Sequence, residues 1–216
     1  MKVGILGSGP VGHALAKGFL DLGHAVMLAS RSPEKLEEWR REAGSRASTG
    51  MPGDAAVWGD LVVLAVKGEA AEEAVRKAPP EALAGKTVID TTNPIAPVPP
   101  EDGVLKFFTT LEDSLMERLQ RLAPDARFVK AFSCVGSALM VHPALPGGKP
   151  TMFICGNDGP AKAEVGDILD AFGWEVEDLG SAVAARAIEP LCILWCIPGF
   201  LRNDWKRAYR VMRPEG

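Results

Sequence analysis

An apolar run followed by a glycine-rich turn opens the chain and constrains its fold more than any other feature. The first residues read MKVGILGSGPVG, so the spacing G-x-G-x-x-G stands between a predicted strand, 2–6, and a predicted helix, 10–22. In such a turn Gly7 permits the tight bend, Gly9 lets the backbone approach a pyrophosphate, and Gly12 lets helix and strand pack closely. Free N–H groups at the helix N-terminus can then bind phosphate. The pattern predicts a dinucleotide site formed by Gly7, Ser8, Gly9, Pro10, Val11 and Gly12.

The end of the second predicted strand, 24–29, indicates which dinucleotide binds. NAD-binding chains place Asp or Glu there to hold the ribose 2′-OH, but residues 29–31 include no acid. A hydroxyl and two cations stand there instead, and this set suits a 2′-phosphate. The sequence therefore predicts NADP rather than NAD, bound through Ser30, Arg31 and Lys35.

The same segment has a second interpretation. Ser32 can cap a helix that has Pro33 at its first position, and the cations are then solvated surface residues. Both interpretations can hold together, because a helix capped in this way would carry Lys35 toward the site.

Strands and helices alternate along the chain, which predicts a parallel sheet with helices on both faces. The fold class is α/β, a Rossmann-type doubly wound, mainly parallel sheet of about eight strands. We expect residues 1–180 to form the NADP-binding domain and residues 181–216 to form a helical tail that packs on the sheet or on a partner subunit. After the first two strands, six more are expected at 47–49, 60–66, 86–90, 127–131, 151–155 and 175–179.

Helical periodicity predicts three segments in the second half of the chain. Thr110 is expected to cap one helix, and Pro160 to lie near the start of another. The tail after Ser181 is helical by its period, with Pro190 and Pro198 kinking or breaking it. A last segment, residues 201–212, has the pattern of an amphipathic helix. Its apolar side packs in the core or forms a subunit interface and consists of Leu201, Trp205, Tyr209 and Met212.

Composition limits the partners. The 216 residues carry a net charge of −4, which gives no basic field for nucleic acid or an anionic membrane. The four cysteines show no close metal-ligand spacing. Met1 leads directly into the first strand, leaving no room for a signal peptide, and the apolar stretch 190–201 is too short to span a bilayer. We expect a cytoplasmic chain with no metal, membrane or nucleic-acid partner.

The sequence offers no convincing acid–base pair, so no catalytic residue is assigned. Lys67 and His142 are the candidates that could face the expected site, and Asp90 more often braces a loop through backbone N–H groups. Hydride transfer between two ring cofactors does not require an acid or a base. The protein then needs only to hold two rings face to face and to exclude water.

Several ordered segments resemble the NADPH-dependent reductases of the deazaflavin coenzyme F-420 (F420) and, equally, the cytosolic reductase domain of the STEAP metalloreductases. These segments are GILGSGPVGHALAKGFLDLGHAVMLASRSPEK, VIDTTNP, FVKAFSCVGSALM, FICGND and DLGSAVAARAIEPL. The resemblance implies a deazaflavin or flavin acceptor and a homodimer. It also implies that Val66, Asn93 and Gly136 lie by the nicotinamide half of the cofactor. Lys67 and Pro94, in the same loops, complete the predicted cofactor contacts.

Two other functions remain open. One is reduction of a small imine or ketone, as in relatives of pyrroline-carboxylate reductase, which would use a proton donor. The other is a redox sensor that binds NADPH without turnover.

Overall fold

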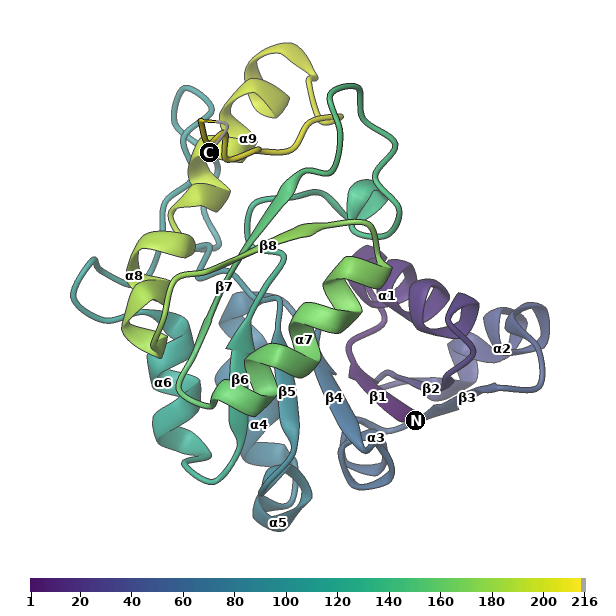
Figure 1. Ribbon diagram of the computed structural model, residues 1–216. Coiled ribbons are helices and arrows are strands. Elements are labelled where there is room, and N and C mark those ends of the chain that lie inside the picture. Colours follow the sequence, from purple (N-terminus) through teal and green to yellow (C-terminus); the bar gives the residue numbers. More distant parts are fainter. Residues whose placement is uncertain (215–216) are drawn as a thin grey trace.

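Figure 1 shows the computed structural model, which describes residues 1–214. A central eight-stranded sheet has the order β3-β2-β1-β4-β5-β6-β7-β8. The chain starts in the middle and winds outward in both directions, so the predicted doubly wound α/β fold is confirmed. The strands are β1 (Lys2–Leu6), β2 (Ala25–Ala29), β3 (Ala47–Gly50), β4 (Leu61–Leu64), β5 (Thr87–Asp90), β6 (Arg127–Lys130), β7 (Thr151–Gly156) and β8 (Glu175–Asp178).

The sheet is parallel except at one junction. β6 and β7 pair antiparallel, with Lys130 opposite Cys155, whereas β7 and β8 run parallel to each other. The six strands from β3 to β6 therefore end at one edge, and ligands of doubly wound sheets bind at that edge.

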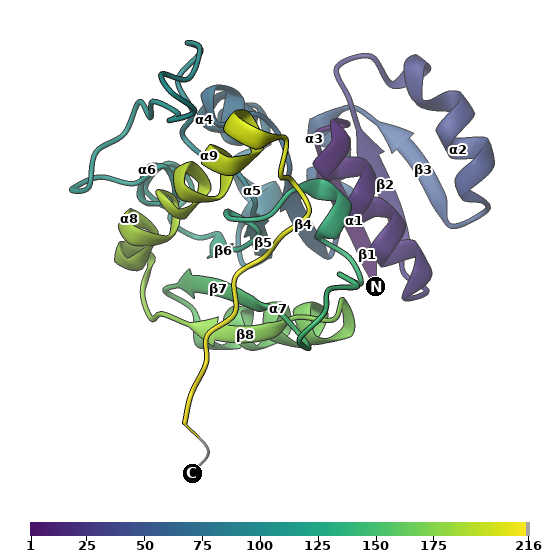
Figure 2. The ribbon, with the colours of Figure 1, turned by 90° about the horizontal axis from the view of Figure 1, so that it is seen from above.

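Helices cover both faces of the sheet, as Figure 2 shows from above. They are α1 (Pro10–Asp21), η1 (Pro33–Leu36), α2 (Glu37–Ala43), α3 (Pro52–Trp58), α4 (Gly68–Lys77), α5 (Pro80–Leu83), α6 (Leu115–Leu122), η2 (Ser137–Leu139), α7 (Gly159–Ala171), η3 (Ala182–Ala184), α8 (Ala185–Ile188) and α9 (Leu191–Arg202). Successive strand residues point to opposite faces. Ile5 accordingly belongs to the core with α1 and α7, and Leu6 to the core with α3, α4 and α6.

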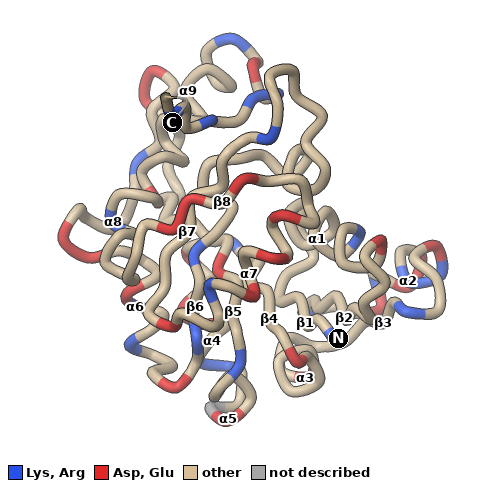
Figure 3. Tube along the Cα trace, viewed as in Figure 1, with Lys and Arg blue, Asp and Glu red and all other residues tan. Residues whose placement is uncertain are grey.

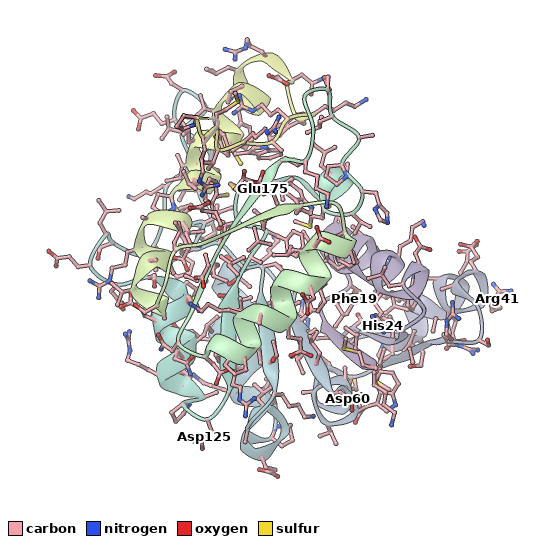
Figure 4. All side chains as sticks on the ribbon, viewed as in Figure 1. Phe19, His24, Arg41, Asp60, Asp125 and Glu175 are labelled. Carbon is pink, nitrogen blue, oxygen red and sulfur yellow. The ribbon has the colours of Figure 1, made fainter. Side chains whose placement is uncertain are left out.

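The core beneath α1 and α7 is closed by aromatic packing. The rings of Phe19 and Phe172 meet edge to face with centroids 5.2 Å apart, and both side chains are buried. Figure 4 contrasts Phe19, inside this core, with Arg41, which extends outward from α2. This packing fixes α1, and with it the glycine-rich turn that precedes α1.

The helix that Thr110 was expected to cap begins four residues later than predicted, so that expectation is wrong. Ser114 caps α6, because its hydroxyl accepts from the Glu117 N–H while the Glu117 carboxylate accepts from the Ser114 N–H. This reciprocal pair is a capping box. Thr110 instead accepts from the Glu112 N–H in a local turn, and Leu111 is exposed.

The tail is helical only as far as Arg202. Asn203 adopts a left-handed conformation with φ 56° and ends α9, and Trp205 packs back on Gly199. The segment beyond is extended beside β7, where the Thr151 N–H donates to Tyr209 O over 2.8 Å. The amphipathic helical interpretation of residues 201–212 is therefore wrong.

Pro190 and Pro198 act differently. Pro190 is the N-cap residue of α9 and separates it from α8, whereas Pro198 lies inside α9 without ending it. A proline at 198 leaves the carbonyl of Leu194 without its usual helical donor. Arg207 replaces that donor, because its Nη2 lies 3.1 Å from Leu194 O and 2.8 Å from Trp195 O.

One helical run in the described part of the chain, Ala182–Arg202, is long and apolar enough to span a membrane by length and composition alone. In its most apolar window, 44% of the residues are buried inside the chain. The run has 21 residues and contains the shorter apolar stretch 190–201, and the expectation that the chain has no membrane partner stays a prediction.

Candidate functional site

The three glycines of the glycine-rich turn have different surroundings. Packing requires a glycine at two of the positions, whereas the third faces open space. Gly7 has φ +122°, and a Cβ there would lie 2.4 Å from Ala65 O. A Cβ on Gly12 would lie 2.0 Å from Gly7 O. Around Gly9, by contrast, a Cβ would meet no atom within 4 Å. The backbone at Gly9 is thus accessible in the way that close approach by a ligand requires.

The N-terminus of α1 lies behind that open space. Gly9 is its N-cap residue, Pro10 follows, and the first turn contains no acidic residue. The His13 N–H donates to Gly9 O over 3.0 Å, so the N–H groups of Val11 and Gly12 precede the first helical hydrogen bond. A helix end of this kind attracts anions through these N–H groups and the helix dipole.

The end of β2 lies at the same edge as this turn, since Leu6 of β1 pairs with Ala29 of β2. Ser30 is fixed there, because its N–H donates to Gly50 O and its hydroxyl accepts from the Ser32 N–H over 3.1 Å. Arg31 and Lys35 are exposed. Within residues 1–214, no ion pair involves either cation.

Ser32 does not cap a helix through its hydroxyl. It occupies the N-cap position of η1 but makes no side-chain cap hydrogen bond, and only its carbonyl accepts from the Lys35 N–H. Its N–H is used by Ser30. The expected hydroxyl cap is therefore wrong, whereas the predicted helical turn beginning at Pro33 is present.

Charges elsewhere on the molecule are mixed. Figure 3 shows basic and acidic residues interspersed along the trace, including on α2 next to the end of β2. The candidate phosphate site therefore depends on local groups rather than on a broad basic face.

The loops after β4, β5 and β6 contact one another at the same edge. Val66 and Lys67 follow β4, and Lys67 is the exposed N-cap residue of α4. A Cβ on Gly68 would lie 1.9 Å from Asn93 O, so these two backbones touch. The Asn93 amide donates to Ser133 O over 3.0 Å. Pro94, next in the chain, is buried.

Two buried polar atoms in these loops have no hydrogen-bond partner, namely Asn93 Oδ1 and Ser133 Oγ. An unsatisfied buried polar group costs about 1–3 kcal/mol, and such groups call for an explanation. Phe132, directly before Ser133, has φ 62° although it is not glycine. Strained backbone of this kind concentrates at binding sites. Both features point to a ligand at this position.

Gly136 lies where the loop after β6 meets the tail. It is the N-cap residue of η2, and a Cβ there would lie 2.8 Å from the Trp195 ring. Close to it, burial raises the pKa of Cys134 to about 12, so this thiol stays protonated at neutral pH. His142 follows η2 in the chain and is exposed, and its backbone N–H donates to Phe172 O.

A buried ion network behind these loops was missed by the sequence analysis, apart from Asp90. Asp90 accepts from the Thr92 N–H and hydroxyl over 2.9 and 2.7 Å, so it braces the loop as expected. Lys130 Nζ lies 2.7 Å from Asp90 and 3.0 Å from Glu189. Burial alone lowers the pKa of Lys130, but the two carboxylates outweigh it and raise that pKa. The sequence feature that could have predicted this network is the lysine inside the otherwise apolar strand sequence FVKAF, because a buried lysine requires an acidic partner.

No group of three or more metal-ligating side chains occurs in the part of the chain that the structure describes. The chemical groups at this edge are thus backbone N–H groups, the three exposed cations Arg31, Lys35 and Lys67, and buried amide and hydroxyl groups.

Comparison with known proteins agrees with this geometry. Residues 2–94 match the model of the family described as coenzyme F420-dependent NADP oxidoreductase. A crystal structure from Arthrobacter sp. FB24, provisionally described as an F420-dependent NADP-reductase, is 32% identical and superposes with a TM-score of 0.91. It aligns over 99% of this chain and 100% of its own. The chain belongs to the coenzyme F420-dependent NADP oxidoreductase family.

Two further proteins are similar to this chain, one in sequence and one in fold. The metalloreductase STEAP3 of Rattus norvegicus is 32% identical over 208 residues, which cover 93% of this chain. The chain spans only 39% of the length of that relative. A reductive aminase from Aspergillus terreus, solved with NADPH4, cyclohexanone and allyl amine, is 22% identical with a TM-score of 0.67 over 94% of this chain and 62% of its own. The likeness to the reductive aminase shows a shared fold only.

Proposed function

We propose that this member of the F420-dependent NADP oxidoreductase family passes hydride between NADP(H) and a ring acceptor, either coenzyme F420 or a flavin. One observation carries the proposal: the open face at Gly9, in front of the α1 N-terminus, stands at the same edge as the acid-free, cationic end of β2. A dinucleotide that carries a 2′-phosphate fits both features.

Each half of the cofactor has its own set of residues in this proposal. The turn formed by Gly7, Ser8, Gly9, Pro10, Val11 and Gly12 binds the pyrophosphate. Ser30 donates its hydroxyl proton to the 2′-phosphate, Arg31 binds it with a planar fork, and Lys35 adds a point charge. The nicotinamide half lies against Val66, Lys67, Asn93, Pro94 and Gly136.

The two buried polar atoms without a hydrogen-bond partner, Asn93 Oδ1 and Ser133 Oγ, fit the carboxamide group of a bound nicotinamide. Asn93 Oδ1 accepts one of its protons, and Ser133 Oγ donates to its oxygen. NADP(H) supplies the hydride chemistry when it is bound. The chain's own residues orient the ring and exclude water, and no side chain acts as an acid or a base.

The acceptor rests on the family name and the Arthrobacter relative. The rat metalloreductase and the fungal reductive aminase carry activities of their own, and imine or ketone reduction stays an alternative prediction for this chain. The sensor function, the homodimer and the cytoplasmic location also stay predictions.

Titration calorimetry with NADPH and NADH, followed by mixing with coenzyme F420, FMN, FAD or a ketone–amine pair, tests the proposal. We expect tight NADPH binding, weak NADH binding, and oxidation of NADPH by a ring acceptor. Arg41→Ala is the matched control for Arg31→Ala, since Arg41 is an exposed cation on the outer side of α2. Equal affinity for both cofactors, or turnover only with the ketone–amine pair, would contradict the proposal.

A further inference from the structure

Three buried charged side chains connect separate segments behind the proposed nicotinamide loops. Asp90 ends β5, Lys130 ends β6, and Glu189 lies between α8 and α9 in the tail. Their side chains are at most 1% exposed, and Lys130 Nζ contacts both carboxylates. Burying three charges carries a large desolvation cost, so such a network is weak evidence for stability by itself. The contacts of this network with neighbouring loops indicate a second role.

The network holds every backbone and side-chain polar group of Thr92. Lys130 Nζ donates to Thr92 O over 2.8 Å. Asp90 Oδ1 accepts from both the Thr92 N–H and the Thr92 hydroxyl. The ammonium has three protons, and its three partners are Asp90, Glu189 and this carbonyl. Thr92 is therefore fixed by ionic groups on both sides.

Fixing Thr92 fixes Asn93, the next residue. Asn93 O touches the backbone at Gly68 in the loop after β4. The Asn93 amide donates to Ser133 O in the loop after β6. The position of Thr92 thus determines how the loops after β4, β5 and β6 meet.

Glu189 anchors the other end of the network. Its Oε2 accepts from the Leu115 N–H and its Oε1 from the Met116 N–H, each over 3.0 Å. These N–H groups belong to the first turn of α6, where the helix dipole favours a carboxylate. Glu189 therefore joins the tail and α6 to Lys130.

We infer that Asp90, Lys130 and Glu189 are positioning residues, a clamp that holds the Thr92–Asn93 loop in the geometry needed by the nicotinamide half. This inference rests on the proposed function. Loss of the clamp reduces hydride transfer without weakening the contacts of the adenosine half, because those contacts lie at β1 and β2.

Glu189→Gln tests the clamp, and Glu117→Gln is its matched control. Both carboxylates accept N–H groups at the start of α6, but Glu117 pairs with Arg186 rather than Lys130. Displacing a reacting group by about 1 Å can cost about 100-fold in rate. For Glu189→Gln we expect single-turnover hydride transfer to fall about 10- to 100-fold and the fluorescence change of bound NADPH to shrink. Affinity for adenosine 2′,5′-bisphosphate should stay the same, and the control should keep the wild-type rate.

Hydrogen exchange of the amides at 91–95 in the cofactor-free protein gives a readout that does not depend on the proposed function. Exchange at 91–95 that is faster in Glu189→Gln than in Glu117→Gln supports the clamp even if no acceptor reacts. Equal behaviour of the two variants, or wild-type rate and exchange in Glu189→Gln, would overturn it. If Glu189→Gln does not fold, Thr92→Val tests the clamp in the same assays. This substitution removes the hydrogen bond from the Thr92 hydroxyl to Asp90 and leaves every charge in place. If the wild type does not bind NADPH, the proposed function is contradicted. The hydrogen-exchange comparison of the two variants then shows whether the clamp still holds the loop at 91–95.

Discussion

Gly9 and Gly12 stand three residues apart in one turn, but a side chain would meet different surroundings at each. The space at Gly9 is open, whereas a Cβ on Gly12 would overlap the carbonyl of Gly7. Gly9→Val should therefore fold normally and lose NADPH binding. Gly12→Val should lower the unfolding temperature or prevent folding. Thermal unfolding measured beside NADPH titration separates the two effects, and normal NADPH binding in folded Gly9→Val would place the dinucleotide elsewhere.

Arg31 is the residue expected to distinguish the two cofactors. Hydrogen bonds to charged groups contribute about 1.5–3 kcal/mol each, so Arg31→Ala should weaken NADPH binding about 10- to 100-fold. NADH has no 2′-phosphate, and its affinity should barely change. Calorimetric titration of both cofactors, with Arg41→Ala as the control, measures this. Equal losses for NADPH and NADH would refute the phosphate assignment.

Residues that act through the backbone of a local motif could be predicted from the sequence, whereas residues with distant partners could not. The glycine spacing and the acid-free end of β2 are readable because all participants lie within about one βαβ unit. The partners of Lys130 are 40 residues before it and 59 after it, as their numbers show. Only the folded sheet brings these segments together.

At the scale of elements, α6 illustrates how capping chemistry decides a boundary. Thr110 and Ser114 both precede a leucine-rich stretch, but only Ser114 has a glutamate three residues later, at Glu117. The capping box therefore selects Ser114. The error beyond Arg202 has a different cause: a period alone cannot show that Asn203 turns the chain and that Trp205 packs back on α9.

Glu117 predicts a pH dependence of stability. Hydrogen bonds from Arg186 lower the pKa of Glu117 from 4.5 to about 2, with the Ser114 backbone assisting and burial opposing. A carboxyl whose pKa is depressed by folding stabilises the protein above its unfolded pKa. This contribution is complete above about pH 5 and is lost as pH falls from about 4.5 toward about 2.

Glu117→Gln should consequently lower the free energy of unfolding by about 1–2 kcal/mol at pH 7. The difference from the wild type should shrink as the pH falls through this window. Urea unfolding at several pH values measures it. A difference that is constant with pH would show that the carboxylate charge is not the cause.

For the whole molecule, we propose that the chain positions the two rings and that the cofactors supply the chemistry of hydride transfer. Removing a positioned acid or base typically costs about 10²–10⁴ in rate. Lys67→Ala, His142→Ala and Ser133→Ala should each cost less than about 100-fold in single-turnover hydride transfer. A loss of about 10³-fold or more in one of them, with NADPH affinity intact, would favour imine or ketone reduction with that residue as the proton donor.

The central claim is direct hydride transfer from NADPH to a ring acceptor, and single-turnover mixing with deuterated NADPH tests it most directly. The wild-type protein, loaded with NADPH that carries deuterium at the transferred position, is mixed with coenzyme F420 or FMN. We predict that nicotinamide oxidation and ring reduction proceed together in equal amounts, and that deuterium slows both. Bound NADPH that reduces neither ring, yet reduces a ketone–amine pair, would contradict the account.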